Sequence, residues 1–234
     1  MQAPSSQKTI LLIGASRGLG FAMVEEYLGR GWHVIATGRA SSTGKLRELA
    51  ASSDGALEVE VLDTTVVEDI AALKGRLSSR TVDVLFVNAG VTNDDAETIA
   101  DVSTDEFIRV MVTNALSPMR VIESLQDLVT VDGTIGVMSS GQGSLTNNTN
   151  GNHEVYRGSK AALNMFMRSF AARHKDDPRT LLLMAPGWVR TDMGGPEARL
   201  TIQESIPNLV DTMTTYAGRQ GLHYLDYLGR VVPW

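Results

Sequence analysis

Cysteine is absent from the 234 residues of the chain. Disulfides, thiolate metal ligands and cysteine nucleophiles are therefore excluded, which is compatible with a reducing compartment. Long apolar runs are also missing: no stretch approaches the roughly 18 uninterrupted apolar residues of a membrane span, and residues 1–7 lack the apolar core of a signal peptide. We expect a soluble cytoplasmic protein with no membrane partner.

Basic residues are in the minority. The chain carries 21 Lys and Arg against 27 Asp and Glu, which gives a net charge of −6 and a pI near 5.2. This balance offers no electrostatic reason to expect a nucleic-acid partner. The 4 histidines are dispersed without ligand spacing, so we predict no metal site. No Pro/Ser-rich linker or repeat divides the chain, and we expect one domain over residues 1–234 with a flexible segment 1–7.

Short apolar segments alternate with segments of helical pattern. This alternation predicts an α/β, single-domain Rossmann fold: a doubly wound parallel sheet with helices on both faces and the ligand at its carboxyl edge. The strands are expected at 8–13, 33–37, 57–62, 82–87, 133–138 and 181–185. The helices are expected at 21–28, 46–51, 70–77, 104–130 with a kink near Pro118, and 155–175.

A glycine turn lies between the first strand and the first helix. Gly14, Gly18 and Gly20 leave room for phosphate oxygens to approach backbone N–H groups at the positive end of the helix, which indicates dinucleotide binding. NAD-selective enzymes place an acid at the end of the second strand, where this chain has Gly38 followed by Arg39, and Arg17 lies in the glycine turn itself. Two guanidinium groups favour a 2′-phosphate, hence NADP(H) over NAD(H). The alternative is that each arginine is only a solvated surface charge.

Other strand ends also carry polar or small residues. Asp63 closes the third strand, where its carboxylate can accept from an adenine amino group, although turn capping is an equally good account. Asn88-Ala89-Gly90 follows the fourth strand, and a small-residue bend there can lie flat against a ribose. The loop 186–191 follows the sixth strand and is expected to cover the site.

Tyr156 and Lys160 lie four positions apart at the start of a predicted helix. This spacing stacks a phenol and an ammonium on one helix face. A phenol alone holds its proton until about pH 10, but a neighbouring ammonium lowers its pKa toward the range where a general acid or base works best. Tyr-x-x-x-Lys also occurs by chance on ordinary helix surfaces. Asn114 can likewise be only an exposed helix position.

The order and spacing of these motifs resemble the short-chain dehydrogenase/reductase family along nearly the whole chain. Within the family, the resemblance is to the branch of the C-factor signalling protein and the Sniffer-type carbonyl reductases. The branch-level features are the Met138-Ser139-Ser140 run, the long loop before Tyr156, the segment 186–195 and the ending Pro233-Trp234. Ile13 and Val87 depart from the family pattern, at positions where threonine and asparagine are common, and we expect altered cofactor affinity at most.

The resemblance implies hydride transfer between a nicotinamide and a small-molecule carbonyl or alcohol substrate. Tyr156 would donate a proton to the substrate oxygen and Ser140 would hydrogen-bond that oxygen. Lys160 would lower the phenol's pKa and bind the nicotinamide ribose, and Asn114 would hold a water that connects Lys160 to solvent. Counting alone leaves open whether Ser139 or Ser140 faces the substrate; similar branch members favour Ser140. The expected catalytic residues are Asn114, Ser140, Tyr156 and Lys160.

Backbone near Trp188 and Val189, with the Thr191 hydroxyl, would orient the nicotinamide carboxamide. Gln142, Leu145 and Met193 are candidates for lining the substrate pocket, and His153 is expected to be a solvated loop residue. The expected cofactor-binding residues are Gly14, Ser16, Arg17, Gly18, Leu19, Gly20, Arg39, Asp63, Asn88, Ala89, Gly90, Tyr156, Lys160, Pro186, Gly187, Trp188, Val189 and Thr191.

The resemblance also implies a homodimer or homotetramer, because helices around Asn114 and after Tyr156 often pair between subunits in similar enzymes. A second functional hypothesis remains: a cofactor-binding signalling or regulatory protein of C-factor type with incidental catalysis. The intact set Asn114, Ser140, Tyr156 and Lys160 favours the enzyme, because a pure binding module has no need of a proton donor.

Overall fold

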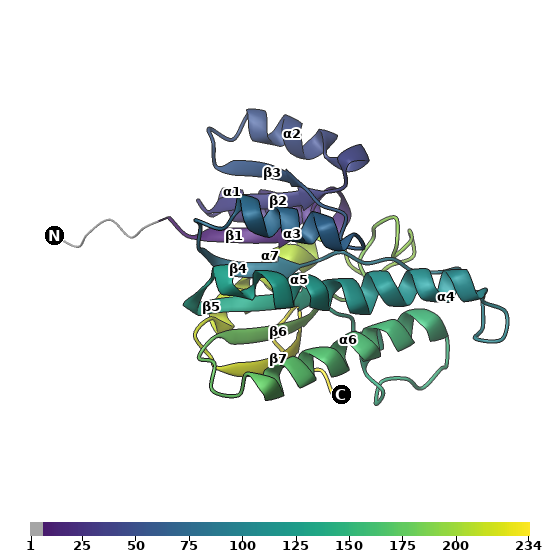
Figure 1. Cartoon of the computed structure of the whole chain (residues 1–234). Helices are drawn as coiled ribbons and strands as arrows, with labels where there is room; N and C mark the ends of the chain where they lie inside the picture. Colours follow the sequence, from purple (N-terminus) through teal and green to yellow (C-terminus); the bar gives the residue numbers. More distant parts are fainter. Residues whose placement is uncertain (1–6) are drawn as a thin grey trace.

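The computed structural model describes residues 7–234 and has a seven-stranded parallel sheet between two layers of helices (Figure 1). The strand order is β3-β2-β1-β4-β5-β6-β7, and each neighbouring pair is parallel. This confirms the predicted doubly wound Rossmann-type sheet. The strands are β1 Thr9–Ile13, β2 His33–Gly38, β3 Leu57–Val61, β4 Val82–Val87, β5 Val129–Met138, β6 Thr180–Ala185 and β7 Gly221–Asp226.

The central strands are apolar throughout because helices cover both faces of the sheet. In β1, Ile10 and Leu12 point into one core and Leu11 and Ile13 into the other, and all four are fully buried. Side chains alternate between the two faces of a strand, so consecutive apolar residues serve two separate cores. The helices are α1 Gly18–Gly29, α2 Gly44–Ala51, α3 Val67–Arg76, α4 Thr104–Met111, α5 Ser117–Leu125, α6 Glu154–Arg173 and α7 Ile202–Tyr216.

Each core belongs to its own set of helices. One core receives Met23 of α1, Leu46 of α2 and Leu209 of α7. The other core receives Leu73 of α3 and Leu163 of α6, together with apolar residues of α5. Within residues 7–234, no helix combines the length and the apolarity that a membrane crossing requires.

The single helix expected over 104–130 is wrong in two respects. A π-helical turn, η2 Val112–Leu116, separates α4 from α5, and α5 ends at Leu125. The irregularity expected near Pro118 is this π-helical turn, which continues directly into α5 and ends just before Ser117 and Pro118. β5 begins at Val129, because its β-branched start pairs with β4 at Val82 before a register shift.

The part of the chain after residue 195, where no helix or strand is predicted from the sequence, contains α7 and β7. The signal for α7 was present: Thr201 and Glu204 form a capping box at its start, with mutual side-chain to backbone hydrogen bonds. The predicted flexibility of residues 1–6 lies outside the described residues, whereas Gln7 donates a hydrogen bond from Nε2 to the Gly31 carbonyl at 3.0 Å.

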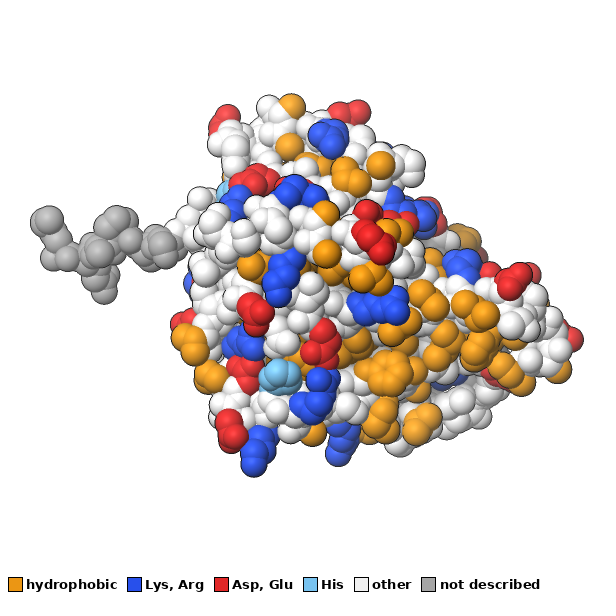
Figure 2. Space-filling view, in the orientation of Figure 1, with side chains coloured by type: hydrophobic (Ala, Val, Ile, Leu, Met, Phe, Trp, Pro, Cys, Tyr) orange, Lys and Arg blue, Asp and Glu red, His pale blue; other side chains and the backbone are white. Residues whose placement is uncertain are grey.

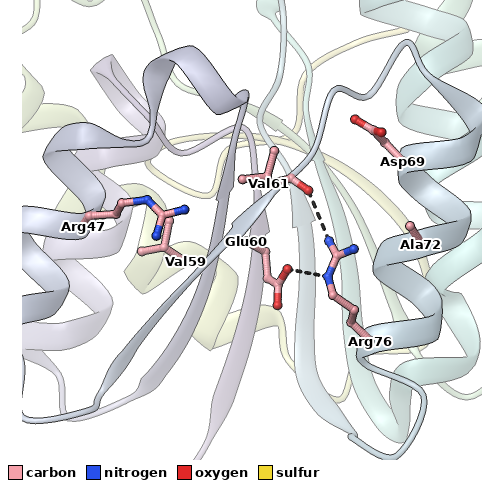
Figure 3. Close-up of a pocket in the computed structure, with 7 residues that line it drawn as sticks. All are labelled: Arg47, Val59, Glu60, Val61, Asp69, Ala72 and Arg76. Atoms are coloured by element: carbon pink, nitrogen blue, oxygen red, sulfur yellow. Dashed lines mark hydrogen bonds and ion pairs between the residues drawn. The ribbon is translucent and has the colours of Figure 1, made fainter.

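The free edge of the sheet at β3 carries a surface pocket of about 370 Å³ between α2 and α3 (Figure 3). Arg76 pairs there with Glu60 at 2.7 Å and donates to the Val61 carbonyl at 3.2 Å. An occupied edge carbonyl is a poorer template for a foreign strand. The pocket contains none of the predicted catalytic residues and is not the candidate site. Its lining residues are Arg47, Val59, Glu60, Val61, Asp69, Ala72 and Arg76.

Gly20 is the glycine of the turn that packing requires most directly. A Cβ at this position would lie 2.6 Å from Asn88 Nδ2 and would also clash with the Gly14 carbonyl. We expect Gly20→Ala to lower the free energy of unfolding by about 1–3 kcal/mol, because the turn and the strand end must separate. Urea unfolding followed by circular dichroism measures this.

Gly29 supplies the matched control in the same helix, since an added Cβ there meets no atom within 4 Å. Gly29→Ala should be neutral or stabilising by roughly 0.5–1 kcal/mol. Equal destabilisation by the two substitutions would contradict the packing argument.

Candidate functional site

The glycine turn after β1 is held by both neighbouring strands. Gly14 has φ +80°, and a Cβ there would lie 2.8 Å from the Ala89 nitrogen. Asn88, at the end of β4, donates from Nδ2 to the Gly14 carbonyl at 2.8 Å. On the other side, Thr37 of β2 accepts from the Gly14 N–H through its hydroxyl at 3.1 Å. Thr37 is not among the residues predicted from the sequence. Its hydroxyl contacts the glycine turn, whereas Ile13 has no hydroxyl to offer.

The N-terminus of α1 fits an anionic group. Gly18 has φ +55°, and a Cβ there would contact only Thr191, at 3.9 Å, so the space in front of the helix is open. The first turn contains no acidic residue, and Arg17 at the N-cap makes no side-chain cap. Unpaired backbone N–H groups and the positive end of the helix dipole therefore face this space. Ser16 lies against Gly38, and Leu19 packs on the core beside α1.

The two arginines predicted to recognise a 2′-phosphate lie near this turn. Arg17 forms an ion pair with Asp192 at 3.2 Å, with 70% and 85% of the two side chains exposed. An ion pair this exposed contributes only about 0–1 kcal/mol to stability. A doubly charged anion can therefore replace Asp192 as the partner of Arg17. Arg39 follows β2 on the surface.

Asp63 caps its own turn. Its Oδ1 accepts from the Thr65 hydroxyl at 2.6 Å and from the Thr65 N–H at 2.9 Å. The Thr65 hydroxyl and, to a smaller extent, the charge of Arg39 hold the pKa of Asp63 below its usual range. Asp63 therefore caps its turn, as one of the two interpretations predicted. Its contact with an adenine amino group remains a prediction.

Asn114 is fully buried, so its interpretation as an exposed helix position is wrong. Its Oδ1 accepts from the Val91 N–H at 2.8 Å, and its Nδ2 donates to the Val91 carbonyl at 2.7 Å and to the Ser159 hydroxyl at 3.0 Å. The π-helical turn that contains Asn114 places its amide between the loop after β4 and α6. The Ser159 hydroxyl in turn donates to the Tyr156 carbonyl at 2.7 Å. Ser159 is not among the residues predicted from the sequence.

Lys160 lies almost completely buried between the ends of β4 and β5. Its ammonium donates to the Met138 carbonyl at 2.9 Å and lies 5.8 Å from the centroid of the Tyr156 ring. A Cβ on Gly90 would lie 3.5 Å from Nζ, so the loop after β4 passes close to the ammonium. Burial lowers the pKa of Lys160 to about 8, because the charged form loses hydration.

The expected lowering of the Tyr156 pKa is wrong for this arrangement. Burial raises the pKa of Tyr156 to about 12, a hydrogen bond with Ser140 acts in the opposite direction, and Tyr224 raises it further. Part of the Tyr156 side chain remains accessible, but dense packing around the residue disfavours the phenolate. At neutral pH the phenol therefore keeps its proton.

Ser139 and Ser140 face opposite ways. Ser139 is buried and donates to Asn164 Oδ1 at 2.6 Å. Ser140 is partly exposed, accepts from the Gln142 N–H at 3.1 Å and lies near enough to Tyr156 to lower the pKa of the phenol. The geometry therefore places Ser140, and not Ser139, beside the phenol.

The loop after β6 is folded against itself. Gly187 has φ +84°, and the Pro186 carbonyl accepts from the Ser205 hydroxyl of α7 at 2.7 Å. Val189 is buried and forms an isolated parallel β-bridge with Leu200. Trp188 is half exposed and donates from Nε1 to the Gly194 carbonyl at 2.8 Å. The Thr191 hydroxyl accepts from the Gly194 N–H at 3.1 Å.

The residues proposed for the substrate side are less uniform. Leu145 and Met193 are exposed apolar side chains, and Gln142 lies in the short turn η4 Gly141–Gly143 after Ser140. His153, at the start of α6, has φ +59° and places Nδ1 2.9 Å from Asp95 Oδ1. His153 thus joins the loop near residue 95 to α6, a contact that the expectation of a solvated histidine omitted.

The chain is similar to known proteins over most of its length. The model of the short chain dehydrogenase family matches residues 8–199. A short-chain dehydrogenase/reductase of Burkholderia multivorans, solved with bound NADP, is 58% identical with a TM-score of 0.95 over 97% of this chain and 100% of that chain. A carbonyl reductase of Pseudomonas aeruginosa PAO1 in complex with NADP is 33% identical with a TM-score of 0.90, over 98% and 100%. C-signal of Myxococcus xanthus is 36% identical over 155 residues, 65% of this chain and 93% of that protein.

Proposed function

Since the chain belongs to the short-chain dehydrogenase family of oxidoreductases, we propose that it is an NADPH-dependent reductase of small carbonyl compounds. The observation that carries this proposal is the meeting of Ser140, Tyr156 and Lys160 at the carboxyl edge of the sheet, beside Gly90. The same group of residues serves the reverse oxidation of an alcohol.

The residues of the glycine turn fit a dinucleotide, and the NADP bound to two similar proteins supports the choice of cofactor. The open helix N-terminus at Gly18 would hold the diphosphate, and Arg17 and Arg39 the 2′-phosphate. Ala89-Gly90 would lie against a ribose, and Lys160 would donate to the nicotinamide ribose hydroxyls. Asp63 would accept from the adenine amino group, and Trp188, Val189 and Thr191 would orient the carboxamide. When bound, the nicotinamide supplies the hydride.

Tyr156 is suited to give a proton to a carbonyl oxygen. Its raised pKa keeps the phenol protonated at neutral pH, so the group holds the proton that reduction of a carbonyl consumes. The Ser140 hydroxyl would donate to the same oxygen as negative charge develops on it. The Lys160 ammonium, held on the same helix face, would stabilise the phenolate that remains after the transfer.

The Asn114 side chain also makes contacts that bear on the position of α6. Both the N–H and the carbonyl of Val91 are bonded to its side chain, and Nδ2 also reaches Ser159. The amide hydrogens are thereby used within the protein. We propose that the Asn114 side chain positions α6 against the end of β4, which fixes where Tyr156 and Lys160 lie.

The test of the function is NADPH oxidation with a panel of ketones, aldehydes and quinones. We expect turnover that is faster with NADPH than with NADH. Tyr156→Phe should lower kcat by at least roughly 100-fold, because general acid catalysis is lost, while the Kd for NADPH measured by fluorescence titration stays within about threefold. Cofactor binding without turnover of any substrate by the wild-type protein would instead favour the signalling hypothesis.

The pH dependence of NADPH capture follows from Lys160. Below its pKa of about 8 the side chain is a charged donor, and above it the amine is neutral; Tyr156, with a pKa of about 12, stays protonated throughout. We expect kcat/KM for NADPH, which reports ionisations of the free enzyme, to be level at low pH and to fall as pH rises through about 8. A profile that stays level to roughly pH 10 would contradict the role of Lys160.

An apolar surface extends over α4, η2 and α6 and is visible as the broad orange area in Figure 2. We propose that a second copy of the chain covers it, because Ile108, Leu116, Met165 and Phe166 are all exposed there and a patch of this kind marks a protein interface. A two-fold pairing through one surface gives a dimer, and a further contact gives a tetramer.

We expect sedimentation velocity to show an oligomer for the wild-type chain and a shift to monomer for Phe166→Glu, because the substitution buries a charge in the interface. Val131→Glu is the matched control, since Val131 on β5 is exposed outside this surface. A wild-type monomer, or equal dissociation by both substitutions, would refute the assignment.

A further inference from the structure

The segment after β7 folds back toward the catalytic residues. The Asp226 N–H donates to the Arg230 carbonyl at 2.9 Å, and the Val232 N–H donates to the Tyr224 carbonyl at 2.9 Å. Leu225 and Val231 form an antiparallel bridge between β7 and the returning segment. Residues 231–234 therefore run beside the edge strand toward the loop that carries Ser140.

Trp234 joins three parts of the molecule. Its carbonyl accepts from the Thr146 N–H at 3.1 Å and from the Thr146 hydroxyl at 2.7 Å, and the Ser144 hydroxyl lies 3.4 Å away. Its ring centroid lies 5.4 Å from that of Tyr224 on β7, and the guanidinium of Arg168 on α6 lies 4.9 Å from the ring. Loop, edge strand and helix thus share one residue that is 39% exposed.

Tyr224 continues the connection to Ser140. The residue is almost fully buried, and its hydroxyl donates to the Ser140 carbonyl. The hydroxyl also lies beside Ser139 and Asn164, and burial raises the pKa of Tyr224, so the group remains a donor at neutral pH. On the other side of the loop, Asn164 donates from Nδ2 to the Gly143 carbonyl at 3.2 Å.

We propose that Trp234 and Tyr224 are positioning residues that hold the 140–146 loop so that the Ser140 hydroxyl stays against Tyr156. The inference rests on the proposed function, in which Ser140 donates to the substrate oxygen. Ser140 is followed by one short turn and then by a polar exposed loop, so its direction depends on what fixes the residues after it. Tyr224 fixes the Ser140 backbone directly, and Trp234 fixes residues 144–146 and buttresses the Tyr224 ring.

The test compares Trp234→Ala and Trp234→Phe. Trp234→Ala keeps the backbone carbonyl that contacts Thr146 but removes the ring contacts with Tyr224 and Arg168 that hold this residue in place. We expect kcat to fall by roughly tenfold, because a loosely held catalytic group is costly even when it is present. KM and Kd for NADPH should stay unchanged, since no glycine-turn residue contacts Trp234 among residues 7–234. Trp234→Phe keeps an aromatic ring and should restore most of kcat. Val231→Ala, at a side chain 77% exposed in the same segment, is the matched control and should behave as wild type.

A double-mutant cycle with Ser140→Ala shows whether Trp234 acts through Ser140. If it does, Trp234→Ala lowers kcat only slightly further in the Ser140→Ala background, because both substitutions act on the same hydroxyl. Fully additive losses would overturn the proposal. So would a loss of kcat together with a matching loss of NADPH affinity and thermal stability, because that pattern indicates a general structural defect.

Amide hydrogen exchange of the substrate-free protein gives a readout that does not depend on activity. Residues 140–148 should exchange faster in Trp234→Ala than in wild type, while β4 and α1 keep their protection. Unchanged exchange in this loop overturns the proposal even if kcat falls. If the wild-type protein turns over no carbonyl substrate, the proposed function fails, and the exchange data alone decide whether Trp234 holds the loop.

Discussion

A buried ammonium is the constraint on which the site depends. Lys160 lies between two strand ends and faces the Met138 carbonyl, at a position where hydration is lost and the pKa falls to about 8. Burial of a charge is costly unless its surroundings compensate. Gly90 lies beside this ammonium and beside the Asn114 amide at the end of β4. In the proposed function, the ammonium has N–H groups left to donate to the nicotinamide ribose hydroxyls.

The glycine turn and the catalytic helix are linked through the end of β4. Asn88 holds the turn through the Gly14 carbonyl, and a few residues later Val91 is held on both its backbone groups by Asn114. From Asn114 the hydrogen bonds continue through Ser159 to the Tyr156 backbone. The distance between the glycine turn and Tyr156 is thus set by buried polar contacts, and these fix geometry more strictly than apolar packing does.

The alternating strands and helices were predictable because each depends on a local pattern. The sequence analysis nevertheless merged α4, η2 and α5 into one helix and started β5 too late, since a π turn and the register shift near Val82 arise from contacts with distant residues. It placed Ser140 among the catalytic residues, but counting could not separate it from Ser139. Backbone alternation after β5 turns one hydroxyl inward to Asn164 and the other toward Tyr156.

The sequence by itself determined the sheet, the glycine turn and the presence of a phenol and an ammonium on one helix face, because periodicity and spacing encode them locally. Only the tertiary structure decided the direction of the Tyr156 pKa, which burial raises although the sequence predicted a lowering. It also decided that Tyr224 and Trp234 lie against the Ser140 loop, since residues 84 and 88 positions apart meet there. Desolvation and long-range contact depend on how the chain packs, and no local pattern records either.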